Sequence, residues 1–130
     1  MKIVPDKRSH PRVPLETTAN LIAGNSTVVV TIENISVSGV MFHSDCQIKL
    51  GEIVSIVFQG VLKENLFEES VLGRIVTTSR KESGNTYGLQ FSTFLAPEDQ
   101  PCLSDFVNKT PGKGISFLRN PHYERPERRE

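Results

Sequence analysis

The sequence predicts an all-β domain, an antiparallel barrel of six short strands followed by one α-helix. The middle of the 130-residue chain is rich in β-branched residues, and its apolar stretches are short and separated by small turn clusters. Five or six short strands linked in this way are typical of closed or nearly closed antiparallel barrels. Gly73 lies inside the longest stretch, and glycine inside a strand often marks the bulge or bend at which a barrel strand turns.

Six stretches of sequence are expected to form the strands. In the second stretch, alternation places Val30, Ile32 and Asn34 on one face. Glu33 and Ile35 then lie on the other face. The stretches are, in order, Thr17–Ile22, Thr27–Ile35, Gly39–His43, Glu52–Phe58, Glu68–Ser79 and Thr86–Phe91.

One helix is expected over Pro97–Asn108, on one end of the barrel. A proline and two carboxylates at its start suit a first helical turn. Leu103, Phe106 and Val107 are spaced three and four residues apart, which gives the helix one apolar face. A Thr-Pro-Gly sequence directly after residue 109 ends the pattern.

The remainder, residues 109–130, is predicted to be a basic tail that is extended or disordered, because glycine and proline recur and apolar residues are few. Phe117 and Leu118 are its candidate docking point, on the barrel or on a partner, and we expect the tail to be dispensable for the barrel. The chain therefore divides into a loop over residues 1–15, a barrel with its helix over residues 16–108, and the tail.

The charges of the chain are unevenly distributed, although 15 Lys and Arg residues balance 15 Asp and Glu residues. Residues 1–12 and residues 108–130 each carry +3, which leaves −6 on residues 13–107. An anionic ligand would therefore be attracted to the ends of the chain. The zero net charge and the lack of tryptophan count against a barrel that binds single-stranded nucleic acid, which needs basic and aromatic residues along its strands.

Several other classes of protein are not expected. No apolar stretch approaches the roughly 18 residues of a membrane span, and the N-terminus lacks the apolar region of a signal peptide, so a cytoplasmic location is expected. Cys46 and Cys102 form neither a disulfide framework nor a zinc motif. His10, His43 and His122 are scattered along the chain, and His10 is expected to be exposed to solvent. We therefore expect no metal, no cofactor and no catalytic residues, and the protein is not expected to be an enzyme.

The first candidate binding motif is RSHPR at residues 8–12, just before the first predicted strand. Pro11 and Pro14 disfavour a helix there, so Arg8 and Arg12 lie on an extended or turning segment. A guanidinium group can hold a phosphate, bind the O6 and N7 of guanine, or stack on a base. The pair is consistent with a purine-nucleotide site, although arginine pairs also occur at solvated termini.

The second candidate motif is NISVSG at residues 34–39, between the second and third predicted strands. Asn34 and Ser36 are two residues apart, so on an extended chain they point to the same side and can present donors and acceptors to one ligand. Gly39 permits a positive φ or a close approach of ligand to backbone. The alternative is a polar turn in which the Asn and Ser side chains bond to their own backbone.

Together the two motifs resemble those of the PilZ domain, the bacterial receptor module for cyclic di-GMP, which is marked by RxxxR and then by [D/N]xSxxG. The runs GRIV at residues 73–76 and YGLQF at residues 87–91 look like the closing strands of that family. The end of the predicted helix, at residues 105–107, looks like its C-terminal helix. The resemblance covers roughly residues 5–108.

The resemblance implies a six-stranded antiparallel PilZ-type β-barrel with a flanking C-terminal α-helix, and it implies a set of ligand contacts. The two arginines would hold guanine edges and phosphates, the Asn and Ser would receive a guanine base and the backbone near it, and the glycine would leave room for the ligand. A lysine before the first arginine could add a charge near a phosphate, and is equally suited to be solvated. The asparagine replaces the commoner aspartate and cannot pair ionically with arginine. The implied cyclic di-GMP-binding residues are Arg8, Arg12, Asn34, Ser36, Gly39 and Lys7.

The function implied is that of a cyclic di-GMP receptor, which changes conformation on binding and signals to an unidentified protein partner in motility, biofilm or envelope processes. Ligand binding would draw the arginine loop onto the barrel. The expected protein is a monomer or weak dimer, with no nucleic acid partner. The alternative is a PilZ-like protein-interaction module that does not bind nucleotide, as in the type IV pilus branch. The intact motifs count against that alternative.

Overall fold

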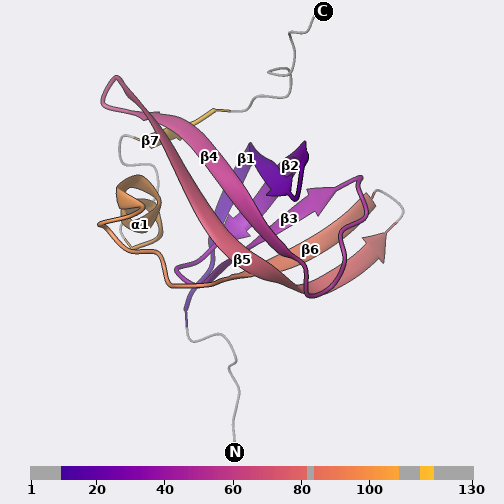
Figure 1. The fold of residues 1–130 in the computed structure, drawn as a ribbon. Coiled ribbons are helices and arrows are strands. Elements are labelled where there is room, and N and C mark those ends of the chain that lie inside the picture. Colours follow the sequence, from indigo (N-terminus) through magenta and orange to yellow (C-terminus); the bar gives the residue numbers. More distant parts are fainter. Residues whose placement is uncertain (1–9, 82–83, 109–114, 119–130) are drawn as a thin grey trace, which may run out of the picture.

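A computed structural model of the chain describes residues 10–81, 84–108 and 115–118. Within these residues almost all regular structure is β-strand, and a single helix follows the sixth strand, so the predicted all-β class is confirmed (Figure 1). The elements are β1 (Val13–Ala23), β2 (Ser26–Ile35), β3 (Gly39–Ser44), β4 (Ile53–Leu62), β5 (Asn65–Lys81), β6 (Gly84–Phe91), α1 (Pro101–Asn108) and β7 (Ile115–Phe117).

Six of the strands pair in a closed antiparallel ring. Their order is β1-β2-β3-β6-β5-β4, and residues 20–22 of β1 pair with residues 55–57 of β4 to close it. Three of the strands run several residues beyond a predicted limit, since β1 begins at Val13, β4 continues to Leu62 and β5 begins at Asn65. The ring matches the six-stranded antiparallel arrangement expected from the sequence.

The core fills the inside of this ring. Along β4, Val54, Ile56 and Phe58 are buried and alternate with more exposed residues, as a strand with one face toward the core requires. The helix contributes Leu103, which is fully buried. The largest fully buried side chains are Phe42, Phe58, Leu21, Ile32, Ile35, Ile56, Ile75 and Leu103.

A bulge near the end of β2 changes which side chain faces the core. The register of β2 against β3 shifts between Ile32 and Asn34, so Glu33 is an extra residue in that strand. An inserted residue reverses the alternation beyond it. Ile35 is therefore fully buried and Asn34 only half-buried. The predicted faces of these two residues are thus exchanged, since Ile35 and not Asn34 shares the face of Ile32.

Gly73 does not mark a bulge. It pairs in regular register with Val54 and Phe91, and the irregularity of β5 falls three residues later, at Val76. A Cβ at Gly73 would collide with the Gln90 carbonyl oxygen of β6. The glycine is needed because two backbones approach closely.

Helix α1 begins at Pro101 rather than at the predicted Pro97. The four residues before it form a turn, in which the N–H of Gln100 donates to the carbonyl of Ala96 at 2.7 Å. The first helical bond runs from the N–H of Ser104 to the carbonyl of Gln100 at 2.8 Å. Pro101 therefore occupies the first helical position, where a missing N–H is harmless. Pro97 and Pro101 both suit the first position of a helix, and the helix begins at Pro101.

A short strand, β7, lies in the predicted tail. It pairs antiparallel with Gly60–Leu62 of β4, beyond the part of β4 that pairs with β1. The Phe117 ring contacts Phe58, Phe67 and Phe106, with ring centroids 5.2–6.3 Å apart. These contacts join the strand to both the barrel and the helix.

Leu118, directly after β7, extends the attachment. Its N–H donates to the carbonyl of Gln59 at 2.8 Å, and its own carbonyl accepts the hydroxyl of Thr17 at 3.2 Å. The rest of the predicted tail lies outside the described residues. The predicted boundaries at residues 15 and 108 stay predictions, while β1 itself begins at Val13. Among the helical residues that the structure describes, none forms a helix long and apolar enough to cross a membrane.

Candidate functional site

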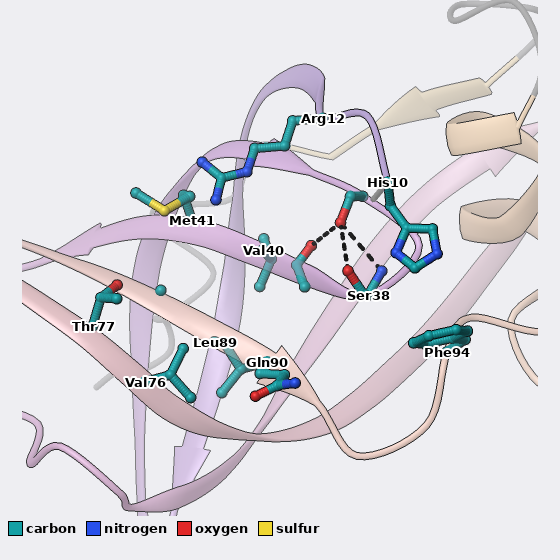
Figure 2. A pocket seen from close by; sticks show the side chains of 13 residues that line it. His10, Arg12, Ser38, Val40, Met41, Val76, Thr77, Leu89, Gln90 and Phe94 are labelled. Carbon is teal, nitrogen blue, oxygen red and sulfur yellow. Dashed lines mark hydrogen bonds between the residues drawn. The ribbon is translucent and has the colours of Figure 1, made fainter. Parts of the chain in front are cut away.

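A cavity of about 620 Å³, which we call the Arg12 cavity, opens in the described structure. Its walls come from the segment before β1, the β2–β3 turn, strands β3, β5 and β6, and the segment after β6 (Figure 2). A volume of this size is in the usual range for small-molecule sites. The lining residues are His10, Arg12, Ser36, Ser38, Gly39, Val40, Met41, Val76, Thr77, Gly88, Leu89, Gln90 and Phe94.

Arg12 brings a positive charge to this cavity. Its side chain is exposed and extends along the cavity toward Met41, whereas the His10 ring points toward Phe94 (Figure 2). Among the described residues, the guanidinium forms no ion pair. No carboxylate among the described residues competes for its donors, which suit an anion or the acceptor edge of a base.

Ser36 belongs to the β2–β3 turn, residues 36–39, which we call the motif turn. Its N–H donates to the carbonyl of Gly39 at 2.8 Å, and its Oγ accepts the N–H of Ser38 at 3.2 Å. The Ser36 hydroxyl also lies 3.3 Å from that of Ser38. The serine is buried and bonds within its own turn, as the alternative interpretation of the motif expects.

The motif turn is also fixed to the segment after β6. The N–H of Phe91 donates to the carbonyl of Ser38 at 2.9 Å, and the N–H of Leu95 donates to the carbonyl of Val37 at 2.9 Å. These two bonds flank Phe94. The turn and the wall that carries Phe94 are therefore held together by backbone groups rather than by side chains alone.

Gly39 is needed for strand packing. Its φ is not positive, and a Cβ at this position would lie 2.5 Å from the carbonyl oxygen of Leu89 on β6. Of the two predicted reasons for glycine at this position, the positive φ therefore does not apply. The close approach is made by the neighbouring strand of the same chain. Gly88, which the sequence analysis did not single out, is similarly restricted by Thr77 in the cavity wall.

Asn34 lies beside the motif turn but does not line the Arg12 cavity. It pairs in register with Pro14 of β1 and Met41 of β3. Its Oδ1 atom is buried and has no hydrogen-bond partner among the described residues. Such an acceptor costs about 1–3 kcal/mol when it is left unpaired, so it is suited to receive a donor from a ligand or an arginine.

Of the residues selected from the sequence, the structure brings Arg12, Ser36 and Gly39 to one cavity. Lys7 and Arg8 lie outside the described residues, and the assignment of all six residues to ligand binding stays a prediction. Phe94 could not be selected from the sequence, because a phenylalanine beside Leu95 and outside both motifs carries no signal of binding. The sequence also suggested a solvated His10, whereas the His10 ring is half-buried and packs edge-on against Phe94 with centroids 4.8 Å apart.

The described residues contain no cluster of three or more His, Cys, Asp or Glu side chains that could hold a metal ion. Both cysteines are free, Cys46 exposed and Cys102 buried. Burial raises the pKa of the Cys102 thiol to about 11, and a hydrogen bond to Glu69 adds to the effect. Cys102 lies in α1 and is not part of the Arg12 cavity.

Comparisons with known proteins agree with this architecture. The structure of the Bacillus subtilis inhibitor of motility (MotI/DgrA) superposes with a TM-score of 0.62 at 14% sequence identity, covering 82% of this chain and 54% of that chain. At this identity the similarity concerns the fold, and the chain spans about half the length of that protein. No curated protein matches the sequence significantly. The family model of the PilZ domain matches residues 6–109, and because this is most of the sequence, the chain belongs to the PilZ domain family.

Proposed function

We propose that this protein is a receptor for cyclic di-GMP. The observation that carries the proposal is the meeting of Arg12 with Ser36 and Gly39 around one cavity of about 620 Å³. The arginine comes from one family motif and the other two residues from the second, although more than twenty residues separate them in the chain. Membership of the PilZ family supports the same ligand.

The chemistry of Arg12 suits this ligand. Cyclic di-GMP carries two phosphates and two guanines, and a guanidinium group forms paired hydrogen bonds with a phosphate or with the O6 and N7 of guanine. The uncompensated charge of Arg12 among the described residues and the positive balance of residues 1–12 would attract the dianionic ligand. Lys7 and Arg8 precede it in sequence and would add further donors.

Asn34 does not line the Arg12 cavity, and it would join the proposed site where ligand binding uncovers its Oδ1 atom. Its buried Oδ1 lacks a partner in the described structure, and the N–H groups of guanine or of an arginine could satisfy it. The ligand would draw the arginine loop toward Asn34 and the motif turn. We propose that this change of conformation is the signal and that a protein partner reads it, in motility, biofilm or envelope processes.

The second candidate is a PilZ-like interaction module that does not bind nucleotide. One observation favours it, because the structure explains Ser36 and Gly39 without a ligand. Ser36 bonds within the motif turn, and Gly39 makes room for Leu89. Both residues would be retained by a domain that had lost its ligand but kept its fold.

Calorimetric titration with cyclic di-GMP, alongside GTP and cyclic GMP, separates the two candidates. A receptor binds cyclic di-GMP in preference to the other two nucleotides, and Arg12→Ala weakens binding by well over tenfold, because truncation of a charged partner costs about 2–5 kcal/mol. Arg80→Ala is the matched control, since Arg80 is also exposed but lines a different hollow. A folded wild-type protein that shows no heat of binding supports the interaction module.

A further inference from the structure

Phe94 is an unusual component of the Arg12 cavity. Its side chain lines the cavity and is 60% exposed, and it belongs to neither motif. An exposed aromatic ring contributes little to folding, because most of its apolar surface stays in water. A large apolar side chain left open in the wall of a ligand-sized cavity is instead typical of a surface that a ligand covers.

Hydrogen bonds hold the backbone on both sides of Phe94. The preceding Phe91 N–H donates to Ser38 and the following Leu95 N–H donates to Val37, each at 2.9 Å. Both carbonyls belong to the motif turn. The backbone that carries the ring is therefore held at a constant place relative to the turn, as a preorganised binding surface requires.

Phe94 is 60% exposed although one side of its ring contacts His10. The two rings meet at an interplanar angle of 76° with centroids 4.8 Å apart, so they touch edge-on rather than as a parallel stack. Figure 2 shows His10 on one side of Phe94. Arg12 follows His10 in the segment that leads into β1, farther from Phe94. Phe94 and Arg12 thus come from separate walls of one cavity and offer complementary chemistry, a flat apolar face and a charged planar donor.

We propose that Phe94 is the stacking surface for one guanine of cyclic di-GMP, with Arg12 holding a guanine edge or a phosphate of the same ligand. This inference rests on the proposed function and adds a residue to the site. An aromatic face binds a base by stacking, which the arginine, serine and glycine of the two motifs do not supply in the same way. It also favours a ligand that carries purine bases over inorganic phosphate.

Titration of four variants with cyclic di-GMP tests the inference. Phe94→Ala should weaken binding about tenfold, because base–aromatic stacking contributes about 1–3 kcal/mol per base. Phe94→Leu keeps apolar bulk without a planar face and should lose most of the same affinity, whereas Phe94→Trp should restore it. Leu66→Ala is the matched control, since Leu66 is 77% exposed and does not line the cavity.

A proton NMR measurement separates stacking from a merely structural role. A guanine above an aromatic ring has its H8 resonance shifted upfield, so this shift should appear with the wild-type protein and with Phe94→Trp, and disappear with Phe94→Leu. If Phe94 acts only by holding the segment of His10 in place, His10→Ala should weaken binding as much as Phe94→Leu does. The stacking role instead requires a smaller loss in His10→Ala, with the upfield shift retained.

The outcomes are distinct from those of the proposed function. Binding by the wild type, loss in Arg12→Ala and full affinity in Phe94→Leu would overturn the stacking role and leave the receptor function intact. An equal loss in His10→Ala and Phe94→Leu, with no upfield shift in the wild type, would also overturn it. A wild type that does not bind cyclic di-GMP would reject the receptor function and the stacking role together.

Discussion

The carboxylate of Glu69, on β5, accepts the backbone N–H of Leu103 in the first turn of α1 at 2.8 Å. Its second oxygen accepts the N–H of Cys102 at the same distance. The helix has no acidic residue in its own first turn, so a strand more than thirty positions earlier in the chain caps it. Glu69 is buried, and the two bonds fasten the helix to the barrel.

We predict that Glu69→Ala lowers the free energy of unfolding by about 2–3 kcal/mol, because two buried N–H groups lose a charged acceptor. Urea denaturation measures the change. Glu68→Ala is the control, since Glu68 is exposed and bonds only to the Gln59 side chain among the interactions described, so its effect should stay within about 0.5 kcal/mol. Equal stability of the two variants would show that the cap contributes nothing.

We predict that the Cys102 thiol lowers the free energy of unfolding at alkaline pH. Its pKa is raised from 9.0 to about 11, chiefly by burial and then by the hydrogen bond to Glu69. At a pH between 9.0 and about 11, the folded protein keeps on this thiol a proton that the unfolded chain has lost. The free energy of unfolding therefore falls as the pH rises through this range. The unfolding free energy of Cys102→Ala, compared with that of the native sequence at pH 7, 9 and 10.5, should show the smaller alkaline loss. Parallel pH curves would contradict the assignment.

Substitution of Gly39 should damage the fold and not only the site. In Gly39→Ala the new Cβ would lie 2.5 Å from the Leu89 carbonyl oxygen, and relief of such a contact costs about 1–3 kcal/mol. Ser36→Ala, which loses hydrogen bonds in the same turn, should cost about 1 kcal/mol. Thermal unfolding of both variants gives the comparison, and a Gly39→Ala protein as stable as wild type would mean that β3 and β6 separate easily.

The β4–β5 hairpin offers a stabilising change. Its two-residue turn, Lys63-Glu64, has positive φ values of 51° and 71°, a geometry that favours Asn-Gly. The double substitution Lys63→Asn, Glu64→Gly should therefore raise the unfolding free energy by about 1 kcal/mol. The double alanine variant removes the same charges without relieving the backbone, and should not stabilise. A gain in the free energy of unfolding in both double variants would show that removal of the two charges, and not the backbone conformation, causes the stabilisation.

Truncation separates β7 from the rest of the tail. A chain ending at Asn108 loses the contacts of Phe117 with three other phenylalanines, and should lose about 2 kcal/mol, or roughly 10 °C in thermal midpoint. A chain ending at Leu118 keeps them and should melt near wild type. The sequence suggested that the whole tail is dispensable, and two equal midpoints near that of the wild type would support that simpler expectation.

The pattern of apolar residues was enough to predict the six strands of the ring, its closed or nearly closed form and the helix, but not β7. Alternation along a strand reports burial directly, as in β4. It failed at Asn34 and Ile35, because the extra residue of a bulge depends on the partner strand and leaves no local signal. The predicted start of α1 was four residues too early, because the Glu69 carboxylate that caps the helix is distant in sequence.

The candidate site was predictable only in part, for a related reason. Two motifs located Arg12, Ser36 and Gly39, but they could not show that Gly39 serves the packing of β6. Phe94 reaches the cavity because backbone bonds wrap its segment around the motif turn. Such bonds can be made by any residue except proline, so no pattern of side chains predicts them.

The position of β7 has a consequence for self-association. Strand β4 pairs with β1 over residues 55–57 and with β7 over residues 60–62, while the N–H of Leu118 occupies the carbonyl of Gln59 between them. Without β7, the far end of β4 would present unpaired backbone groups beside a cluster of phenylalanines, a template for edge-to-edge aggregation. The three-residue strand β7 thus covers this edge of β4 and opposes the pairing of β4 with a strand of another molecule.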